Sequence, residues 1–267
     1  MFRTRAAADA IHSGVVCAAG CDLHDVYASD FGIAFDEVSQ WVARRYGGVA
    51  PGVQASHRSW FFAELLARGG VRSPFVEVGV HRGDFSAGLL RHLRHLVNNS
   101  VGRPRYFLVD PWQRIVSLMG YQTIVVSEVL QQSYLQSAIR KLAPFWSQVS
   151  LLQVSSREAA RFFDDRSAGF VYLDARHDYC AVMDDLLLYW PKVAPGGIFA
   201  GDDYLMDGTW SQCENGSWIE GGVKRAVEDF AMTSQLPYFF FHNQWLIRRP
   251  VAQGDVDPLH AWHQRNG

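Results

Sequence analysis

Cysteine is scarce in this chain of 267 residues, which contains four cysteines in all: Cys17, Cys21, Cys180 and Cys213. So few cysteines over this length exclude a disulfide-stabilised scaffold. Cys17 and Cys21 form a C-x-x-x-C pair without the second cysteine pair that would complete a zinc site. We therefore expect both to be ordinary thiols.

Long apolar runs and an excess of basic residues are also missing. No run approaches the ~20 apolar residues that cross a membrane, and Asp9 and His12 interrupt the apolar stretch that a secretory signal would need. The formal net charge is −2, and no Lys/Arg-rich segment suggests a nucleic-acid surface. We expect a cytoplasmic protein that acts on a small molecule and binds neither nucleic acid nor membrane. Organelle targeting and homo-oligomerisation stay open.

What the chain has is a globular composition, with 48% hydrophobic and 19% charged residues. From residue 74 onward, short apolar runs alternate with helical patterns. Strands are expected at 75–79, 106–109, 149–154, 170–173 and 197–200, and helices at 85–96, 125–142, 156–163 and 180–189. This alternation predicts right-handed crossovers and a mainly parallel sheet with helices on both faces.

The two ends of the chain are expected to differ from this central pattern. Residues 1–55 lack a clear strand pattern and contain an expected helix near 34–46, so we predict a helical or lid region there. The main domain is expected over 56–249, beginning with a helix at 56–68, and the tail over 250–267. A helix at 222–232, followed by strands at 238–241 and 244–247, predicts a C-terminal antiparallel hairpin.

Carboxylates occur at or near the ends of four expected strands. They are Glu77, Asp110, Asp174 and the pair Asp202 and Asp203. In an open α/β sheet, ligands bind beyond the carboxyl ends of the strands. The sequence therefore predicts that these acids line one edge of the sheet and form the functional site.

The first of these acids belongs to a glycine-rich turn, Glu77-Val-Gly79-Val-His-Arg-Gly83-Asp-Phe-Ser86. It has neither the GxGxxG of dinucleotide-binding folds nor the Lys-Ser/Thr of a P-loop. A carboxylate at this turn favours a cationic ligand over a pyrophosphate. Asp110 can accept hydrogen bonds from ribose hydroxyls. A simple glycine turn and a turn-forming Asp before Pro111 remain the alternatives.

The other acids lie in Asp174-Ala-Arg-His177 and Gly201-Asp202-Asp203. Three carboxylates at the ends of adjacent strands can hold a hard divalent cation such as Mg²⁺, which relieves their mutual repulsion. His177 has a side chain whose ordinary pKa of ~6.5 suits a general base. Solvated loop acids or helix caps are the alternative for Asp202 and Asp203.

These motifs resemble the class I S-adenosylmethionine (SAM)-dependent methyltransferases, and more closely the metal-dependent O-methyltransferases of the macrocin and mycinamicin type. The resemblance implies a Rossmann-like, mainly parallel seven-stranded sheet with a C-terminal antiparallel hairpin. It implies a SAM site formed by Glu77, Gly79, Gly83, Ser86, Asp110, Trp112, Ser156 and Asp174. It also implies a site for Mg²⁺ or another divalent cation at Asp174, Asp202 and Asp203, with His177 as the catalytic base.

The chain departs from that family at its N-terminus, because residues 1–55 do not correspond to the long N-terminal region of the macrolide enzymes. The sugar substrate therefore does not follow from the resemblance. In the catechol-type branch, the acidic set usually ends in Asn at the position of Asp203. A metal-independent SAM methyltransferase, a non-catalytic SAM-binding protein and an NAD(P)-dependent oxidoreductase stay open as alternatives.

Overall fold

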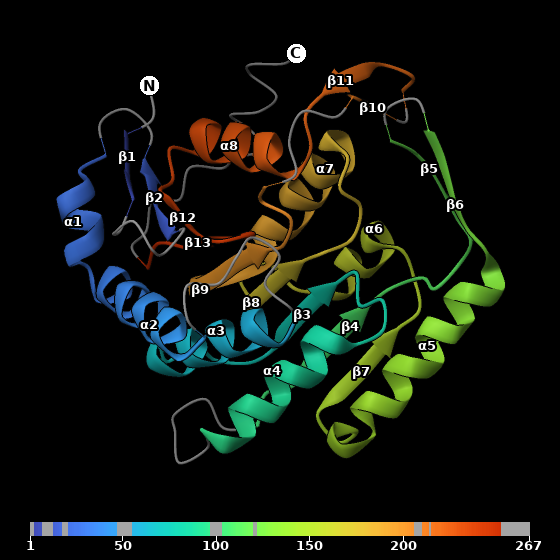
Figure 1. Cartoon of the computed structure of the whole chain (residues 1–267), viewed down its shortest axis with the longest axis horizontal. Coiled ribbons are helices and arrows are strands. Elements are labelled where there is room, and N and C mark those ends of the chain that lie inside the picture. Colours follow the sequence, from blue (N-terminus) through green and yellow to red (C-terminus); the bar gives the residue numbers. More distant parts are fainter. Residues whose placement is uncertain are drawn as a thin grey trace.

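The fold is described from a computed structural model, which covers residues 3–6, 13–17, 21–46, 55–96, 103–119, 122–205, 210–213 and 215–251 (Figure 1). The strands of the main sheet are β1 (Arg3–Ala6), β2 (Ser13–Cys17), β3 (Phe75–Val78), β4 (Tyr106–Val109), β7 (Val149–Leu152), β8 (Ala168–Leu173), β9 (Val193–Gly201), β12 (Tyr238–Phe241) and β13 (Gln244–Arg248). A second sheet contains β5 (Ile115–Met119), β6 (Gln122–Val126), β10 (Trp210–Gln212) and β11 (Trp218–Glu220).

Eight α-helices accompany these strands in the described ranges. They are α1 (Leu23–Ala28), α2 (Asp30–Tyr46), α3 (Ala55–Arg68), α4 (Asp84–His95), α5 (Glu128–Leu142), α6 (Ser156–Ala159), α7 (Tyr179–Tyr189) and α8 (Val223–Ser234). Short 3₁₀ helices lie at Ala143–Phe145, Ala160–Phe162 and Trp190–Lys192. No helix in these ranges is both long enough and apolar enough to span a bilayer.

The main sheet has the strand order β1-β2-β12-β13-β9-β8-β3-β4-β7. Its strands from β9 to β7 are parallel to their neighbours. β13 is inserted antiparallel between β9 and β12, which confirms the expected C-terminal hairpin. The expected α/β class and all seven expected strands are confirmed, but the sheet has nine strands because β1 and β2 extend it.

The extension begins with β2, which pairs antiparallel with β12 from the other end of the chain. All five residues of β2, Ser13–Cys17, are buried. The expectation that residues 1–55 lack strands is therefore wrong. A five-residue segment gains its strand conformation from the neighbour that it pairs with, and that partner is not encoded nearby in the sequence.

The two faces of the sheet carry separate hydrophobic cores, because alternate residues of a strand point to opposite faces. Phe75 and Tyr172 pack on the face covered by α2, α3, α4 and α5. Val76 and Val171 pack on the face covered by α6, α7 and α8. Figure 1 shows these two layers of helices on either side of the sheet.

The small second sheet, β11-β10-β5-β6, corrects one helix boundary. A helix was expected to begin at residue 125, but Val125 and Val126 belong to β6, and α5 begins at Glu128 with Ser127 as its N-cap. The side chain of Ser127 accepts a hydrogen bond from the backbone of Leu130. β-Branched residues favour the extended conformation, and the helix starts at the first good capping residue.

The four cysteines form two disulfides, Cys17–Cys21 and Cys180–Cys213. The expectation of ordinary thiols at Cys17 and Cys21 is therefore wrong. The second disulfide joins the first turn of α7 to the segment that follows β10. It thus links the small sheet to α7, the helix that follows the loop after β8. The 33-residue separation of Cys180 and Cys213 gave no sign of this pairing.

Candidate functional site

The register of the parallel strands places the expected site residues along one edge of the sheet. Val78 lies opposite Val109 on one side and Leu173 on the other, and Leu173 lies opposite Gly201. The residues that follow these strands therefore emerge side by side. In Figure 1 the arrows of β7, β4, β3, β8 and β9 all point to this side of the molecule. The predicted gathering of the acidic residues at one edge is confirmed.

The glycine-rich turn after β3 passes directly against the end of β8. Gly79 has a φ of +89°, and a Cβ at this position would collide with the backbone carbonyl of Asp174. Gly83 has a φ of +70° and is the N-cap of α4, where a Cβ would lie 3.1 Å from Ala138. Only glycine adopts these conformations without strain and permits such close approach. The two glycines therefore bring the turn beside Asp174.

Asp110 holds this glycine-rich turn in place. One of its carboxylate oxygens accepts hydrogen bonds from the backbone N–H groups of Val80, at 3.0 Å, and His81, at 2.9 Å. The other accepts from the backbone N–H of Trp112 at 2.8 Å. Burial raises the pKa of Asp110, while these three hydrogen bonds act in the opposite direction. A carboxylate has about four acceptor positions, so one position remains for a ligand hydroxyl.

Trp112 was expected to contact the cofactor, but its side chain is completely buried. Its indole N–H donates to the backbone carbonyl of His81 at 2.8 Å. The indole therefore ties the loop after β4 to the glycine-rich turn. Only the backbone of Trp112, and not its buried ring, could therefore contact a ligand.

Glu77 is also buried, with 1% of its surface exposed, on the face of the sheet covered by α3 and α4. It accepts a hydrogen bond of 3.0 Å from the hydroxyl of Tyr106. Burial raises the pKa of Glu77 to about 8, while the hydrogen bond from Tyr106 and the charge of Arg58 act in the opposite direction. The role of Glu77 toward a cationic ligand stays a prediction. Ser86 is fully buried too, beneath the turn.

Ser156 lies at the end of β7, as expected, at the first position of α6. Its backbone carbonyl accepts a hydrogen bond of 2.8 Å from the hydroxyl of Tyr189. The helix is capped by Ser155, whose side chain forms a reciprocal capping box with Glu158. This arrangement fixes the backbone of the segment between β7 and α6 at the edge of the site.

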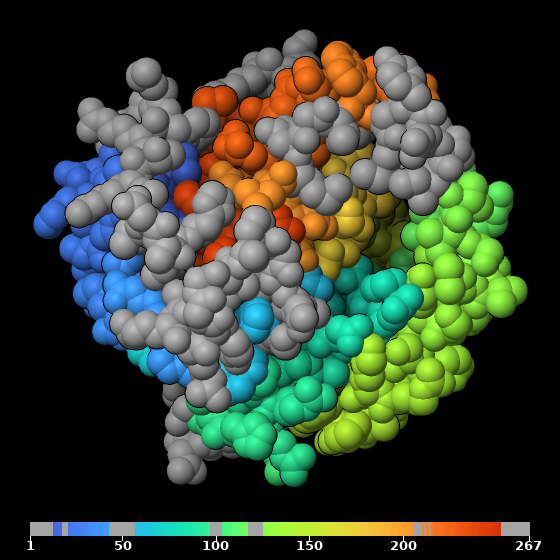
Figure 2. Space-filling model, viewed as in Figure 1, coloured from blue at the N-terminus to red at the C-terminus, as the bar shows by residue number. Residues whose placement is uncertain are grey.

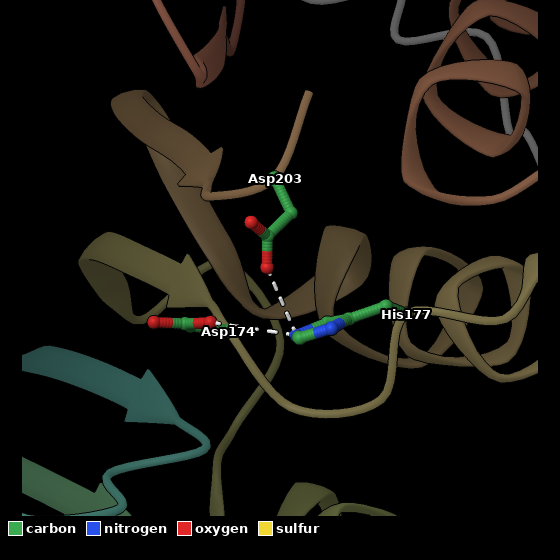
Figure 3. A group of neighbouring side chains, drawn as sticks. All are labelled: Asp174, His177 and Asp203. Atoms are coloured by element: carbon green, nitrogen blue, oxygen red, sulfur yellow. Dashed lines mark ion pairs between the residues drawn. The ribbon is translucent and has the colours of Figure 1, made fainter. Parts of the chain in front are cut away.

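The loops after β8 and β9 bring together Asp174, His177 and Asp203 (Figure 3). Nε2 of His177 lies 3.0 Å from Oδ2 of Asp203 and 3.7 Å from Oδ1 of Asp174. Burial of the imidazole lowers its pKa, but the two neighbouring carboxylates outweigh this, and the pKa of His177 is raised overall. One ligand atom from each of the three residues lies within 4.8 Å of the other two.

This cluster has the chemistry that a divalent cation needs. Among the described residues, the buried Nε2 of His177 has no partner with hydrogen-bonding geometry, although two carboxylates face it. Two carboxylate oxygens and an imidazole nitrogen at the same point suit divalent metals that accept mixed oxygen and nitrogen ligands. The residues present therefore fit a cation.

Asp202 is directed away from this cluster. Its carboxylate forms an ion pair with Arg58 of α3 and accepts a hydrogen bond of 2.5 Å from the side-chain amide of Gln244. Asn243 donates to it at 3.2 Å. The assignment of Asp202 as a metal ligand stays a prediction. Sequence reasoning missed Arg58, Asn243 and Gln244, because a helix residue and a hairpin turn carry no motif.

Arg58 reaches the edge of the sheet from α3. Its Nη1 donates to Oδ2 of Asp174 at 2.9 Å, and its guanidinium lies over the rings of Phe85 and Tyr172. Burial alone would lower the pKa of Arg58. The neighbouring Tyr172, Asp174 and Glu77 raise it by more than burial lowers it, so the pKa lies above its ordinary value. The guanidinium is therefore a permanent positive charge among these acids.

A small cavity and a surface hollow lie next to the cluster (Figure 2). A small cavity beneath the loop after β8 is lined by Asp174, His177, Asp185, Asp202 and Trp245 among others. Figure 2 shows the surface hollowed between the yellow segment of β8 and α7 and the green segment of β5 and β6. Trp210 and Trp218 lie exposed on the β10–β11 hairpin.

Asp185 of α7 provides a test of the electrostatics near this cavity. Burial raises the pKa of its carboxyl to about 7. The folded chain thus binds this proton more tightly than the unfolded chain, so its stabilising effect is complete below pH ~4 and is lost as the pH rises through the folded-state value. We expect Asp185→Asn to flatten the decline in the free energy of unfolding between pH ~4 and ~7 in urea titrations.

The control for Asp185→Asn is Asp165→Asn, an exposed acid on another segment that pairs with Lys192 at 2.6 Å. This variant should keep the pH dependence of the original chain. Equal slopes for Asp185→Asn and the original chain would contradict the assigned protonation of Asp185.

Comparison with known proteins gives two findings. Residues 76–204 match a family described as a methyltransferase domain. Among solved structures, the chain is similar to the O-methyltransferase NovP, with 17% identity, a TM-score of 0.50, and coverage of 83% of this chain and 100% of NovP. A search of curated proteins finds no match.

Two further solved structures show lower similarity. One is an O-methyltransferase from Bacillus cereus in complex with S-adenosylhomocysteine (SAH), at 14% identity, a TM-score of 0.46, and coverage of 84% and 94% of the two chains. The other is TomG from Streptomyces achromogenes in complex with SAM, at 14% identity, a TM-score of 0.46, and coverage of 81% and 89%. The likeness to NovP supports the fold.

Proposed function

We propose that this chain, whose residues 76–204 match a methyltransferase domain, is a class I methyltransferase that transfers the methyl group of SAM to a hydroxyl oxygen of a small molecule, with a divalent cation at the site. The observation that carries the proposal is the convergence of Asp174, His177 and Asp203 beside the glycine-rich turn. Methyl donor and acceptor would then meet at the same edge of the sheet.

The proposed SAM site lies over the ends of β3 and β4. Gly79 and Gly83 allow the ligand to approach the backbone of the turn, and the remaining acceptor position of Asp110 suits a ribose hydroxyl. Ser156 would flank the adenine from the third strand end, and Asp174 would face the methionine part. Glu77, Ser86 and Trp112 support the turn from below, because their side chains are buried.

The proposed acceptor site lies over the ends of β8 and β9. Asp174 and Asp203 would hold the cation, and we assign Asp202 to the same acidic edge. A bound Mg²⁺ or similar ion would lower the pKa of a coordinated acceptor hydroxyl. His177 would receive the hydroxyl proton at Nε2, and the loops would keep oxygen, methyl carbon and sulfur in line, which is largely a positioning effect.

The β10–β11 hairpin supports a planar, apolar acceptor. Trp210 pairs with Glu220 and Trp218 pairs with Gln212, so both indoles lie on the same face of the hairpin. The disulfide from Cys180 fastens this hairpin to the first turn of α7, next to the cluster. We propose that Trp210 and Trp218 form one wall of the acceptor pocket.

The proposal is tested with SAM and a catechol as a surrogate acceptor, with methylated product measured by mass spectrometry. We expect product formation that EDTA abolishes and Mg²⁺ or Mn²⁺ restores. Calorimetry should detect binding of SAH and none of NADH. Binding of NADH in place of SAH would overturn the proposal in favour of an oxidoreductase. SAH binding without transfer to any hydroxyl acceptor tested would favour a non-catalytic SAM-binding protein.

A metal-independent methyltransferase is the second candidate, and one observation favours it. Arg58 already supplies a positive charge to Asp174 and Asp202. Such a charge can balance the acidic edge without a cation. Methyl transfer that is unaffected by EDTA would select this candidate over the first.

A further inference from the structure

We propose that Arg58 is a resident counter-ion that removes Asp202 from the set of metal ligands, so that the cation is held by Asp174 and Asp203 beside His177. This inference rests on the proposed function and assigns individual ligand atoms within its site. Arg58 is thereby a positioning residue, because it acts on the cation through the two carboxylates that it contacts.

The first argument is that both oxygens of the Asp202 carboxylate already have partners. Oδ2 forms the ion pair with Arg58. Oδ1 accepts from the amide of Gln244 at 2.5 Å, from the amide of Asn243 at 3.2 Å and from the backbone N–H of Asp203 at 2.8 Å. Oδ1 has about two acceptor positions and already faces three donors, and the remaining position of Oδ2 lies beside the positive charge of Arg58. A cation coordinated by Asp202 would therefore have to bind next to Arg58, whose charge repels it.

The second argument is that the remaining oxygens point to one place. Oδ2 of Asp174 is used by Arg58, and Oδ1 of Asp203 by Asn243 at 3.0 Å. The other oxygen of each carboxylate, Oδ1 of Asp174 and Oδ2 of Asp203, faces Nε2 of His177 (Figure 3). The partners of the two acids therefore orient one free oxygen from each toward a common centre.

The third argument is the balance of charge. Asp174, Asp202 and Asp203 carry three negative charges at the ends of two neighbouring strands, and Arg58 supplies one positive charge. A divalent cation supplies the other two, so the site with the cation bound is neutral. Nη1 of Arg58 contacts one oxygen of Asp174 and one of Asp202, and the guanidinium stays charged under all relevant conditions. Without Arg58, the same three acids would hold the cation more tightly.

Arg58 is also built into the fold as a fixed part. Only 15% of its side chain is exposed, and its guanidinium stacks 5.4 Å from the ring centre of Phe85 and 5.9 Å from that of Tyr172. Nη1 lies 3.4 Å from the hydroxyl of Tyr172, which in turn donates to Gln244 at 2.6 Å. The partners of Asp202 thus form one connected network beneath the site.

The experiment compares Asp202→Asn with Asp203→Asn, the same chemical change at adjacent positions, using Mn²⁺ binding followed by electron paramagnetic resonance on the full chain. We expect Asp203→Asn to weaken Mn²⁺ binding by at least ~30-fold, since even residues that only support a ligand typically contribute ~10–100-fold. Asp202→Asn should weaken Mn²⁺ binding by less than ~10-fold, because it removes one charge near the cation but no ligand, and losing its charge next to Arg58 should lower the melting temperature.

A third variant, Arg58→Met, tests the counter-ion role directly. We expect Mn²⁺ affinity to rise by ~10-fold or more, because a nearby positive charge is removed and Asp202 is released. We also expect Mn²⁺ to raise the melting temperature of Arg58→Met more than that of the original chain, because the cation would then neutralise the uncompensated acids. Arg58→Lys, which keeps the charge, should bind Mn²⁺ like the original chain.

The outcomes separate this inference from the proposed function. If the original chain binds no Mn²⁺ in the presence of SAH, the proposed metal dependence is wrong, and the counter-ion assignment with it. If the original chain binds Mn²⁺ and Asp202→Asn weakens it as much as Asp203→Asn, only the assignment of Arg58 and Asp202 is overturned. Should Arg58→Met fail to fold, the comparison of the two asparagine variants still decides.

Discussion

His177→Gln is expected to reduce methyl transfer by about 10²- to 10⁴-fold, the usual contribution of a positioned general base. Glutamine keeps a polar side chain of moderate size but cannot accept and release the hydroxyl proton. SAH affinity should be unchanged, because the glycine-rich turn and Asp110 do not depend on the imidazole. The measurement is single-turnover transfer to the surrogate catechol at saturating SAM and Mg²⁺.

Mn²⁺ binding to the same variant separates the role of base from the role of ligand. A base leaves the affinity for Mn²⁺ within a few-fold, whereas a lost metal ligand lowers it by at least ~10-fold. Asp165→Asn, at an exposed acid paired with Lys192 at 2.6 Å, serves as the control for the loss of a surface charge. Full turnover in His177→Gln would show that another group accepts the proton.

Asp110→Ala is expected to have the second large effect, because it removes the acceptor of three backbone N–H groups. Val80, His81 and Trp112 would lose their partner, and unpaired donors of this kind lower stability by about 2–4 kcal/mol in total. The turn would also lose its fixed position over the proposed SAM site. SAH affinity should fall by about 10- to 100-fold in calorimetry.

Asp110→Asn is the matched variant for this prediction. Its amide oxygen can replace one carboxylate oxygen but not both, so we expect effects between those of the original chain and the alanine variant. The melting temperature measures how much the lost hydrogen bonds destabilise the glycine-rich turn. The SAH affinity measures the loss of the proposed contact with the ribose. Unchanged SAH affinity in Asp110→Ala would refute the assignment of this carboxylate to the proposed SAM site.

The central strands and helices could be predicted from local patterns. Runs such as Phe75–Val78 and Ala168–Leu173 are buried on both faces of the sheet, so they consist of apolar residues apart from Glu77 and are followed by glycine or aspartate. Segments whose structure depends on a distant partner escaped prediction. β2 pairs with β12, and β10 pairs with both β5 and β11. β2 and β10 are too short to show a periodic pattern of apolar residues that would have predicted them.

The candidate site divides in the same way. The position of an acid at the end of a parallel strand is a matter of spacing, and this placed Asp110 and Asp174 correctly at one edge. Which way a side chain points, and what it contacts, depends on the elements packed against it. Trp112 is buried by the loop that it stabilises, and Asp202 is turned away by Arg58 from a helix that precedes the sheet.

The sequence by itself determined the α/β class, the positions of the central strands along the chain and the edge at which the acids gather, because these depend on apolar periodicity and on residues next to one another in the chain. Only the tertiary structure decided that the main sheet has nine strands and that the cysteines form two disulfides. It also decided that Asp202 lies outside the cluster of Asp174, His177 and Asp203. These features arise from contacts between distant segments, where packing and charge pairing select one arrangement among several that the local sequence allows.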